Sequence, residues 1–171
     1  GVPLPAAVRA LGEVAPDVRH GDELHDLLCT AVLLPRHPEW DALFCALAAD
    51  GRADAIGLGE QSFWYATERR SSVAALYPDR GLQPFGEAVE ADEAARLLLL
   101  GTMSMCGPVR AADLAATFAL PEWQIEAALT RLEGDGQAVR GTFALASTDL
   151  KWCDRAILQR IHRRTLERLM Q

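Results

Sequence analysis

The residues best suited to chemistry in this chain are the basic side chains near its C-terminal end. From residue 151 onward, six Lys or Arg stand against two acids, a net charge of +4, so the other 150 residues carry −11 of the total of −7. A basic segment on an acidic body is typical of contact with phosphates or with an acidic partner, the alternative being a solvated helix face. The six are Lys151, Arg155, Arg160, Arg163, Arg164 and Arg168.

The spacing of these residues predicts backbone contacts with nucleic acid, which supply affinity without reading sequence. A predicted C-terminal helix places Arg155, Gln159, His162 and Arg163 on one polar face. Its opposite face should pack on the preceding part of the chain through an apolar stripe. That stripe comprises Leu150, Cys153, Ile157 and Ile161. Further candidate contacts are Arg140 and Thr142 on a predicted hairpin, and Arg69 and Arg70 after an earlier one, where pairing with nearby carboxylates is the alternative.

Motifs for enzyme chemistry are absent from the sequence. The two glycines Gly101 and Gly107 belong to no phosphate loop, because no Lys-Ser/Thr follows them, and there is no GxSxG or HExxH motif. The cysteines and histidines are scattered, so the cysteines are interpreted as small buried hydrophobes in a reducing compartment. We therefore expect no catalytic residue, metal or cofactor in this chain.

An internal repeat indicates two similar units. The sequence LAADGRA (47–53) is echoed by LEGDGQA (132–138), and each follows a helix that contains a tryptophan and precedes short strand-like runs. A helix that ends in Asp-Gly is physically sensible because glycine adopts the left-handed conformation that closes a helix.

Apolar spacing gives the elements of the two units. In the first, helices are predicted at 22–34 and 39–49, strands at 52–58 and 62–67, and a short helix at 71–77. In the second, helices are predicted at 92–105, 111–118 and 121–133, and strands at 137–140 and 142–146 with Gly141 at the turn. Helix, short helix, longer helix and hairpin is the winged-helix order.

The predicted fold class is therefore mainly α with small β-hairpin wings, in tandem winged-helix (helix-turn-helix) units. The predicted boundaries are an N-terminal connector at 1–20, unit 1 at 21–78, a linker at 79–91, unit 2 at 92–146 and a basic C-terminal helix at 147–171. No apolar run is long enough to span a membrane and no signal peptide is present, so a cytoplasmic location is expected. The missing starting Met leads us to expect a piece of a longer chain.

The predicted recognition helices are poorly suited to reading bases in the major groove. With Ile125, Leu129 and Leu132 buried, the outward face of the helix at 121–133 carries Trp123 among acidic and small residues. The outward face of the helix at 39–49 has no basic side chain at all and favours close packing. Trp123 is a candidate for stacking on an unpaired base or, as we prefer, for contact with another domain.

The C-terminal run resembles a motif of a known helicase family. KWCDRAILQRIHRRTL (151–166) is similar to the WCDRRLLARIHRxTL stretch of the bacterial large helicase-related (Lhr) family. DELHDL (22–27), WYATER (64–69) with LYPD (76–79), GPV (107–109) and LPEWQIEAAL (120–129) agree in order. The resemblance covers about residues 20–170. The family has a second arginine where Ala156 stands here.

The resemblance implies a parent enzyme that uses ATP and Mg²⁺ to translocate along DNA or RNA, with its ATPase domains outside this chain. It implies nucleic-acid contacts at Arg155, Arg160, His162, Arg163 and Arg164, preceded in the run by Lys151. The leading hypothesis is an accessory module that positions nucleic acid for this helicase. The alternatives are an interdomain scaffold without nucleic-acid contact and, with least support, a glycosylase-like DNA repair module.

Overall fold

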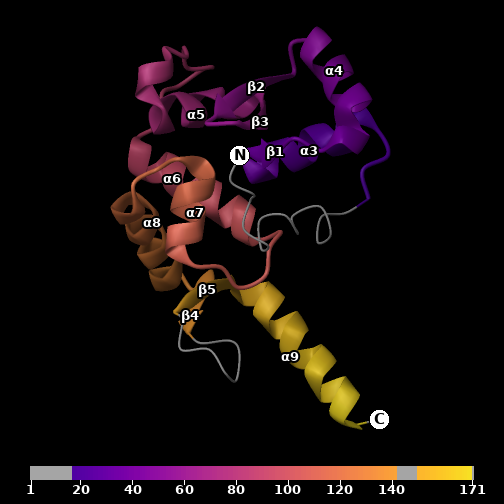
Figure 1. The fold of residues 1–171 in the computed structure, drawn as a ribbon, viewed down its shortest axis with the longest axis vertical. Helices are drawn as coiled ribbons and strands as arrows, with labels where there is room; N and C mark the ends of the chain where they lie inside the picture. The colour runs from indigo at the N-terminus through magenta and orange to yellow at the C-terminus, as the bar shows by residue number, and fades with distance from the viewer. Residues whose placement is uncertain (1–16, 142–149, 171) are drawn as a thin grey trace.

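The computed structural model describes residues 17–141 and 150–170, which are predominantly helical with two small antiparallel sheets (Figure 1). The first half contains α3 (Gly21–Ala31), β1 (Leu34–Pro35), η1 (Pro38–Trp40), α4 (Asp41–Ala49), β2 (Ala53–Leu58), β3 (Gln61–Ala66), η2 (Thr67–Arg69) and α5 (Arg70–Leu76). The second half contains η3 (Pro78–Arg80), α6 (Ala91–Met103), α7 (Ala111–Phe118), α8 (Glu122–Gly134), β4 (Ala138–Gly141), β5 (Lys151–Asp154) and α9 (Arg155–Met170). None of the helices in these ranges has the length and apolar character to cross a bilayer.

The two halves repeat one strand arrangement. In the first sheet the order is β1-β3-β2, so the short strand after the leading helix pairs with the last strand of the hairpin. In the second half β4 pairs with β5, and Val109 forms a bridge to Trp152 on the other side of β5. Val109 comes after α6 in the second half, and β1 comes after α3 in the first, so the two segments hold equivalent positions. The internal repeat is therefore present in the strand pairing as well as in the sequence.

The predicted Asp-Gly helix ends adopt the same turn in both halves. Gly51 and Gly136 have φ angles of +72° and +75°, as a left-handed helix cap requires. The residue after each glycine donates its amide to the carbonyl five positions earlier: Arg52 N to Leu47 O at 2.9 Å, and Gln137 N to Leu132 O at 2.8 Å. Each turn redirects the chain from a helix into the first strand of a hairpin.

A single hydrophobic core joins the two halves, with α6 at its centre. Seven of the thirteen residues of α6 are buried, and the helix packs on α3, α5 and α8. The crossing with α3 is unusually close: a Cβ on Gly101 would lie 1.9 Å from the backbone oxygen of Thr30. A buried hydrogen bond also joins the two halves, because the Tyr77 hydroxyl donates to the Phe118 carbonyl oxygen at 2.6 Å. Gly101, which belongs to no phosphate loop, is needed for this helix crossing.

The predicted linker is anchored to the core. η3 opens it, and in the irregular segment 81–90 the backbone of Phe85 exchanges two hydrogen bonds with the Ser71 hydroxyl of α5, both at 2.9 Å. The Arg70 guanidinium donates to the Gln83 carbonyl oxygen at 3.0 Å. The segment is therefore held against α5 by side-chain hydrogen bonds.

The sequence prediction was wrong about the start of the C-terminal helix and about the turn at Gly141. The predicted C-terminal helix at 147–171 begins only at Arg155, because Lys151–Asp154 forms strand β5. β4 pairs with β5, and Gly141 pairs with Lys151 as a strand residue instead of forming the predicted turn. Thr142 and the rest of 142–149 lie outside the described residues. Trp152 and Cys153 are buried by this pairing, so they belong to the core.

Two smaller differences concern the first half. α3 ends at Ala31, three residues before the predicted end, and Val32 has the left-handed φ of +67° that a β-branched residue rarely adopts. The large apolar residues of the predicted helix at 39–49 have i, i+3, i+4 and i+7 spacing, which predicts a buried stripe. Only Leu47 is buried, whereas Trp40, Leu43 and Phe44 are half-buried at the edge of the core. Phe44 stacks on Trp64 with ring centroids 4.4 Å apart.

The close α3–α6 crossing predicts a large penalty for Gly101→Ala. The added methyl group meets backbone atoms that cannot rotate away, so the helices must separate. We expect the free energy of unfolding to fall by about 2 kcal/mol or more, although alanine has the higher helix propensity. Urea denaturation measures this change.

Gly134→Ala is the matched control, because a Cβ there meets nothing within 4 Å and Gly134 is also helical. Its free energy of unfolding should be unchanged or up to ~1 kcal/mol higher. Equal stability of the two variants would contradict the described helix crossing.

The cysteines provide a test of the β5 assignment. Burial raises the pKa of Cys106 to about 12 and that of Cys153 to about 11, whereas Cys45 is exposed on α4. Because the thiolate is the nucleophile, we expect alkylation of the native protein to modify Cys45 first. Peptide mass spectrometry measures the order. Labelling of Cys153 as fast as that of Cys45 would show that Cys153 is not in a packed strand.

Candidate nucleic-acid interface

The arginines of α9 differ from those in the rest of the described chain in having no partner there. Each of the ten arginines between residues 17 and 141 has a carboxylate within 4 Å or donates to a backbone carbonyl. No ion pair or side-chain hydrogen bond within residues 17–141 and 150–170 involves the arginines of α9. These are Arg155, Arg160, Arg163, Arg164 and Arg168. No carboxylate or carbonyl group of the described residues occupies their guanidinium donors.

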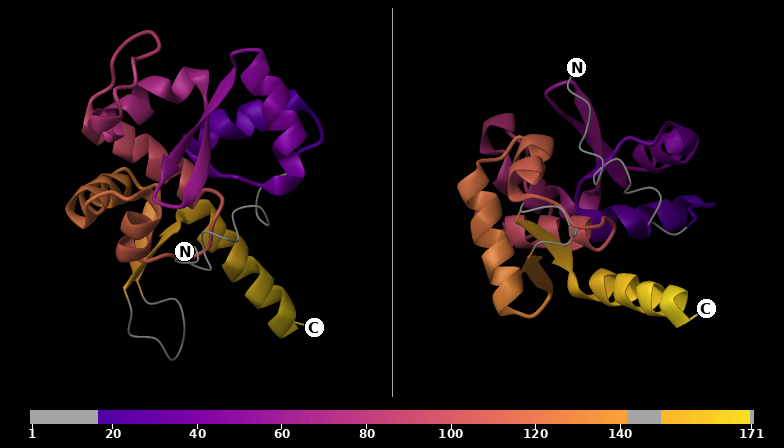
Figure 2. Two further views of the ribbon diagram at one scale, coloured as in Figure 1. Left: turned by 45° about the horizontal axis from the view of Figure 1, so that its top comes forward. Right: turned by 60° about the horizontal axis from the view of Figure 1, so that its bottom comes forward.

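α9 extends away from the body after its first turn (Figures 1 and 2). Ile157 is buried against the second half, whereas Arg160, Ile161 and His162 are exposed. The predicted docking of the whole apolar stripe is therefore wrong: Cys153 and Ile157 are buried, but Leu150 and Ile161 are 53% and 40% exposed. The helix ends as a projecting basic arm instead of a packed element.

Three arginines share one side of this arm. Arg160, Arg163 and Arg164 have i, i+3 and i+4 spacing, which places them together on a helix surface. Arg155 and His162 are seven positions apart, so they share another side of the helix, two turns from each other. A phosphate backbone that runs along the arm can meet the three guanidinium groups in succession.

The base of the arm is fixed to the β4–β5 hairpin. The Arg155 amide donates to the Gln137 carbonyl oxygen at 3.2 Å, and the Arg155 guanidinium lies over Gly136. Asp154 caps the start of α9, since its Oδ1 accepts hydrogen bonds from the Ala156 and Ile157 amides. Lys151 is half-buried at the other end of β5. The direction of the arm is therefore set by the hairpin.

The hairpin candidate Arg140 is engaged within the protein. Its Nε lies 3.1 Å from a Glu133 carboxylate oxygen, and its guanidinium is 5.7 Å from the centroid of the Trp152 ring. The earlier candidates are engaged too, because Arg69 donates to the Cys29 carbonyl oxygen at 2.7 Å and Arg70 lies 5.4 Å from the centroid of the Phe85 ring. No hydrogen bond or ion pair within the described residues joins these three residues to the arm arginines.

The outward faces of α4 and α8 have the character that the sequence predicts. Ile125, Leu129 and Leu132 are buried, whereas Trp123 is 69% exposed near the start of α8. Arg131, the basic residue on this face, lies 3.5 Å from a Glu93 carboxylate oxygen. The exposed residues of α4 are mainly small: Ala42, Cys45, Ala46, Ala48 and Ala49. Neither helix offers an array of donors suited to base edges.

Sequence reasoning missed a cluster of His25, Cys29 and Glu68, whose side-chain ligand atoms all lie within 4.8 Å of one another. The available signal was the four-residue spacing of His25 and Cys29 on a predicted helix, which places both on one face. The carboxylate of Glu68 comes from η2, 39 positions after Cys29, and only the fold brings it there. The interpretation of the histidines and cysteines as scattered overlooked this pair.

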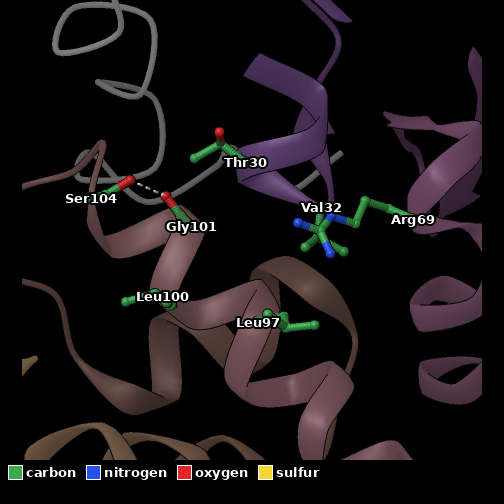
Figure 3. A pocket seen from close by; sticks show the side chains of 7 residues that line it. All are labelled: Thr30, Val32, Arg69, Leu97, Leu100, Gly101 and Ser104. Carbon is green, nitrogen blue, oxygen red and sulfur yellow. Dashed lines mark hydrogen bonds between the residues drawn. The ribbon is translucent and has the colours of Figure 1, made fainter. Parts of the chain in front are cut away.

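A pocket of about 270 Å³ lies beside this cluster, at the crossing of α3 and α6 (Figure 3). Arg69 reaches toward it from η2, and the Ser104 hydroxyl donates to the Gly101 carbonyl oxygen at 2.6 Å at its α6 side. The remaining lining is mostly apolar: Thr30, Val32, Leu97 and Leu100. Arg69 is the charged residue of the lining, and its Nε donates to the Cys29 carbonyl oxygen. We therefore assign no binding or catalytic role to this pocket.

The chain matches no protein-family model, and no curated protein shows significant similarity to it.

Exposure of Trp123 predicts that its removal leaves stability almost unchanged. For Trp123→Ala we expect the free energy of unfolding to change by less than about 0.5 kcal/mol, because the ring is mostly in solvent and alanine suits a helix. Trp64→Ala, which removes a 2% exposed ring from the core, should cost about 3–5 kcal/mol. Guanidinium denaturation of both variants compares them. A loss of several kcal/mol in Trp123→Ala would place that ring in the core.

Proposed function

We propose that this chain is an accessory module that binds the backbone of a nucleic acid through the projecting arm α9. The observation that carries this proposal is the contrast among the arginines: those of the body have internal partners, and those of α9 have none in the described chain. A protein with a net charge of −7 that leaves five guanidinium groups on one exposed helix concentrates its positive potential there.

The chemistry of guanidinium groups favours phosphate as their ligand. Each presents several N–H donors in a planar fork that matches two phosphate oxygens, and it remains charged at all physiological pH values. Three such groups at i, i+3 and i+4 spacing suit a repeating array of phosphates better than a single carboxylate. Contacts of this kind supply salt-dependent affinity and carry no base sequence.

The strand order supports an interpretation of the two halves as winged helices. In each half a leading helix is followed by an edge segment, a further helix and a hairpin, and the edge segment pairs with the second hairpin strand. α4 and α8 then occupy the position of recognition helices. Their outward faces lack free basic side chains, which favours a role in positioning over base reading.

We further propose that the module belongs to an ATP-dependent helicase of the type that the C-terminal motif resembles. In this chain the motif forms β5 and α9, with Trp152 and Cys153 in the core and the arginines outside. One part of the motif thus anchors α9 to the core, and the other part carries the exposed arginines. ATP and Mg²⁺ would bind to ATPase domains elsewhere in such a parent enzyme, and this module would hold the nucleic acid on which they act.

Exposed apolar residues on α9 favour a second candidate function, an interdomain scaffold. Leu169 and Met170 are 78% and 86% exposed, and Ile161 is 40% exposed on the side of the helix away from Arg163. An amphipathic helix of this kind also suits a groove on a partner protein. The scaffold hypothesis requires no contact between the arginines and phosphate, and this difference separates the two candidates.

The proposal predicts salt-sensitive binding that depends on the arm. Fluorescence anisotropy with labelled single-stranded and duplex DNA and RNA should show weaker binding as salt rises. For Arg160→Gln/Arg163→Gln/Arg164→Gln we expect roughly tenfold weaker binding or more, and a slope of log affinity against log salt smaller by about 2 for a single strand. Glutamine removes the charges and retains helix propensity.

The control is Arg36→Gln/Arg52→Gln/Arg80→Gln, which removes the same charge from arginines that have partners on the body. Its binding should stay within about threefold of wild type, because distant charges are largely screened. Equal losses of affinity in both variants would show that binding depends on net charge and not on the arm. No binding by the wild type at low salt would favour the scaffold hypothesis.

A further inference from the structure

Three metal-ligand side chains converge where α3 meets η2. His25 and Cys29 lie one helical turn apart on α3, and Glu68 reaches them from η2. Glu68 Oε2 is 2.5 Å from His25 Nε2 and 3.3 Å from Cys29 Sγ, and the sulfur and the imidazole nitrogen are 3.8 Å apart. Imidazole nitrogen, thiolate sulfur and carboxylate oxygen are the donors that Zn²⁺ binds in proteins.

The separations of the three atoms suit a tetrahedral ion. Bond lengths of about 2.0 Å to nitrogen and oxygen and 2.3 Å to sulfur place neighbouring donors roughly 3.3–3.6 Å apart. The two distances from Cys29 Sγ are close to this range. The contact between Glu68 and His25 must lengthen by about 0.8 Å to reach it. Because the Glu68 side chain is 46% exposed, it can make that shift without moving the core.

We propose that His25, Cys29 and Glu68 form a binding site for a divalent transition metal ion of the Zn²⁺ class, with the fourth coordination position open to water. This site is distinct from the α9 interface, so it does not depend on the proposed nucleic-acid function. The ion would join the leading helix of the first half to the turn that follows its hairpin.

The surroundings of the cluster are compatible with a bound cation. In the absence of metal, burial and the hydrogen bond to Glu68 raise the pKa of Cys29 to about 11, so the thiol keeps its proton and donates it to the carboxylate. A metal ion replaces this proton and supplies the charge that stabilises the thiolate. Asp26 adds negative charge nearby, and Arg69, the adjacent cation, is directed to the Cys29 carbonyl oxygen.

Two of the three ligands are held rigidly by α3, and the third is exposed to solvent. The His25 side chain is 15% exposed and shares a helix face with Cys29, so these two donors are positioned by α3 before an ion arrives. Glu68 is the exposed member and leaves an entry path from solvent. Three protein ligands with an open position are typical of zinc sites that exchange a ligand, whereas closed structural sites have four.

Titration with Co²⁺ as a spectroscopic probe for Zn²⁺ tests the proposal on the 171-residue chain. We expect a near-ultraviolet band of thiolate-to-cobalt charge transfer at one equivalent, bleached when Zn²⁺ is added. Zn²⁺ at about a hundredfold excess over its Kd should raise the Tm by roughly 5–10 °C. Cys29→Ser should abolish the band, and His25→Gln or Glu68→Gln should weaken binding at least about tenfold.

Cys45→Ser is the matched control, because it removes an exposed thiol from α4 and leaves the cluster intact. It should keep the wild-type band and Tm shift. Circular dichroism establishes that each variant is folded. The proposal is overturned if folded wild type gives no band, if Cys29→Ser retains it, or if Cys45→Ser loses it.

Discussion

The close contact of α3 and α6 at Gly101 is the constraint on which the rest of the fold depends. Without a side chain at this position, α6 comes so near to α3 that a Cβ would lie 1.9 Å from the Thr30 oxygen. α6 is the leading helix of the second half and packs on α3, α5 and α8 at once, so its position fixes the two halves relative to each other. The core of the first half thereby continues into that of the second. The β4–β5 hairpin and the base of α9 are held on this common core.

Much of the fold could be predicted from local sequence signals. The Asp-Gly repeat identified two turns that share φ angles and hydrogen bonds, because glycine is required wherever the chain closes a helix in the left-handed conformation. Apolar spacing gave the buried face of α8 correctly, and it predicted the exposure of Trp123. The positions of β2 and β3 were predicted within two residues.

The errors have physical causes that no local pattern reveals. Lys151–Asp154 precedes a basic amphipathic run and was included in its helix, but Trp152 is held as a strand by hydrogen bonds to Val109, 43 positions earlier. The arginines of the candidate interface were identified from sequence, yet only the structure separates Arg140, which pairs with Glu133, from Arg163, which has no partner in the described chain. The cluster at His25 needed Glu68 from another element, so the i, i+4 pair alone was not recognised.

We propose that an acidic body presents a basic arm to nucleic acid. Hydrogen exchange measured by mass spectrometry, with and without a saturating single-stranded oligonucleotide at low salt, locates the contact directly. Bound nucleic acid should slow exchange in Arg155–Met170 and leave the amides of α4 unchanged, because the proposed binding mode places the phosphates along the arginine face of α9. Protection confined to α4 or α8, or no protection at saturation, would contradict this account.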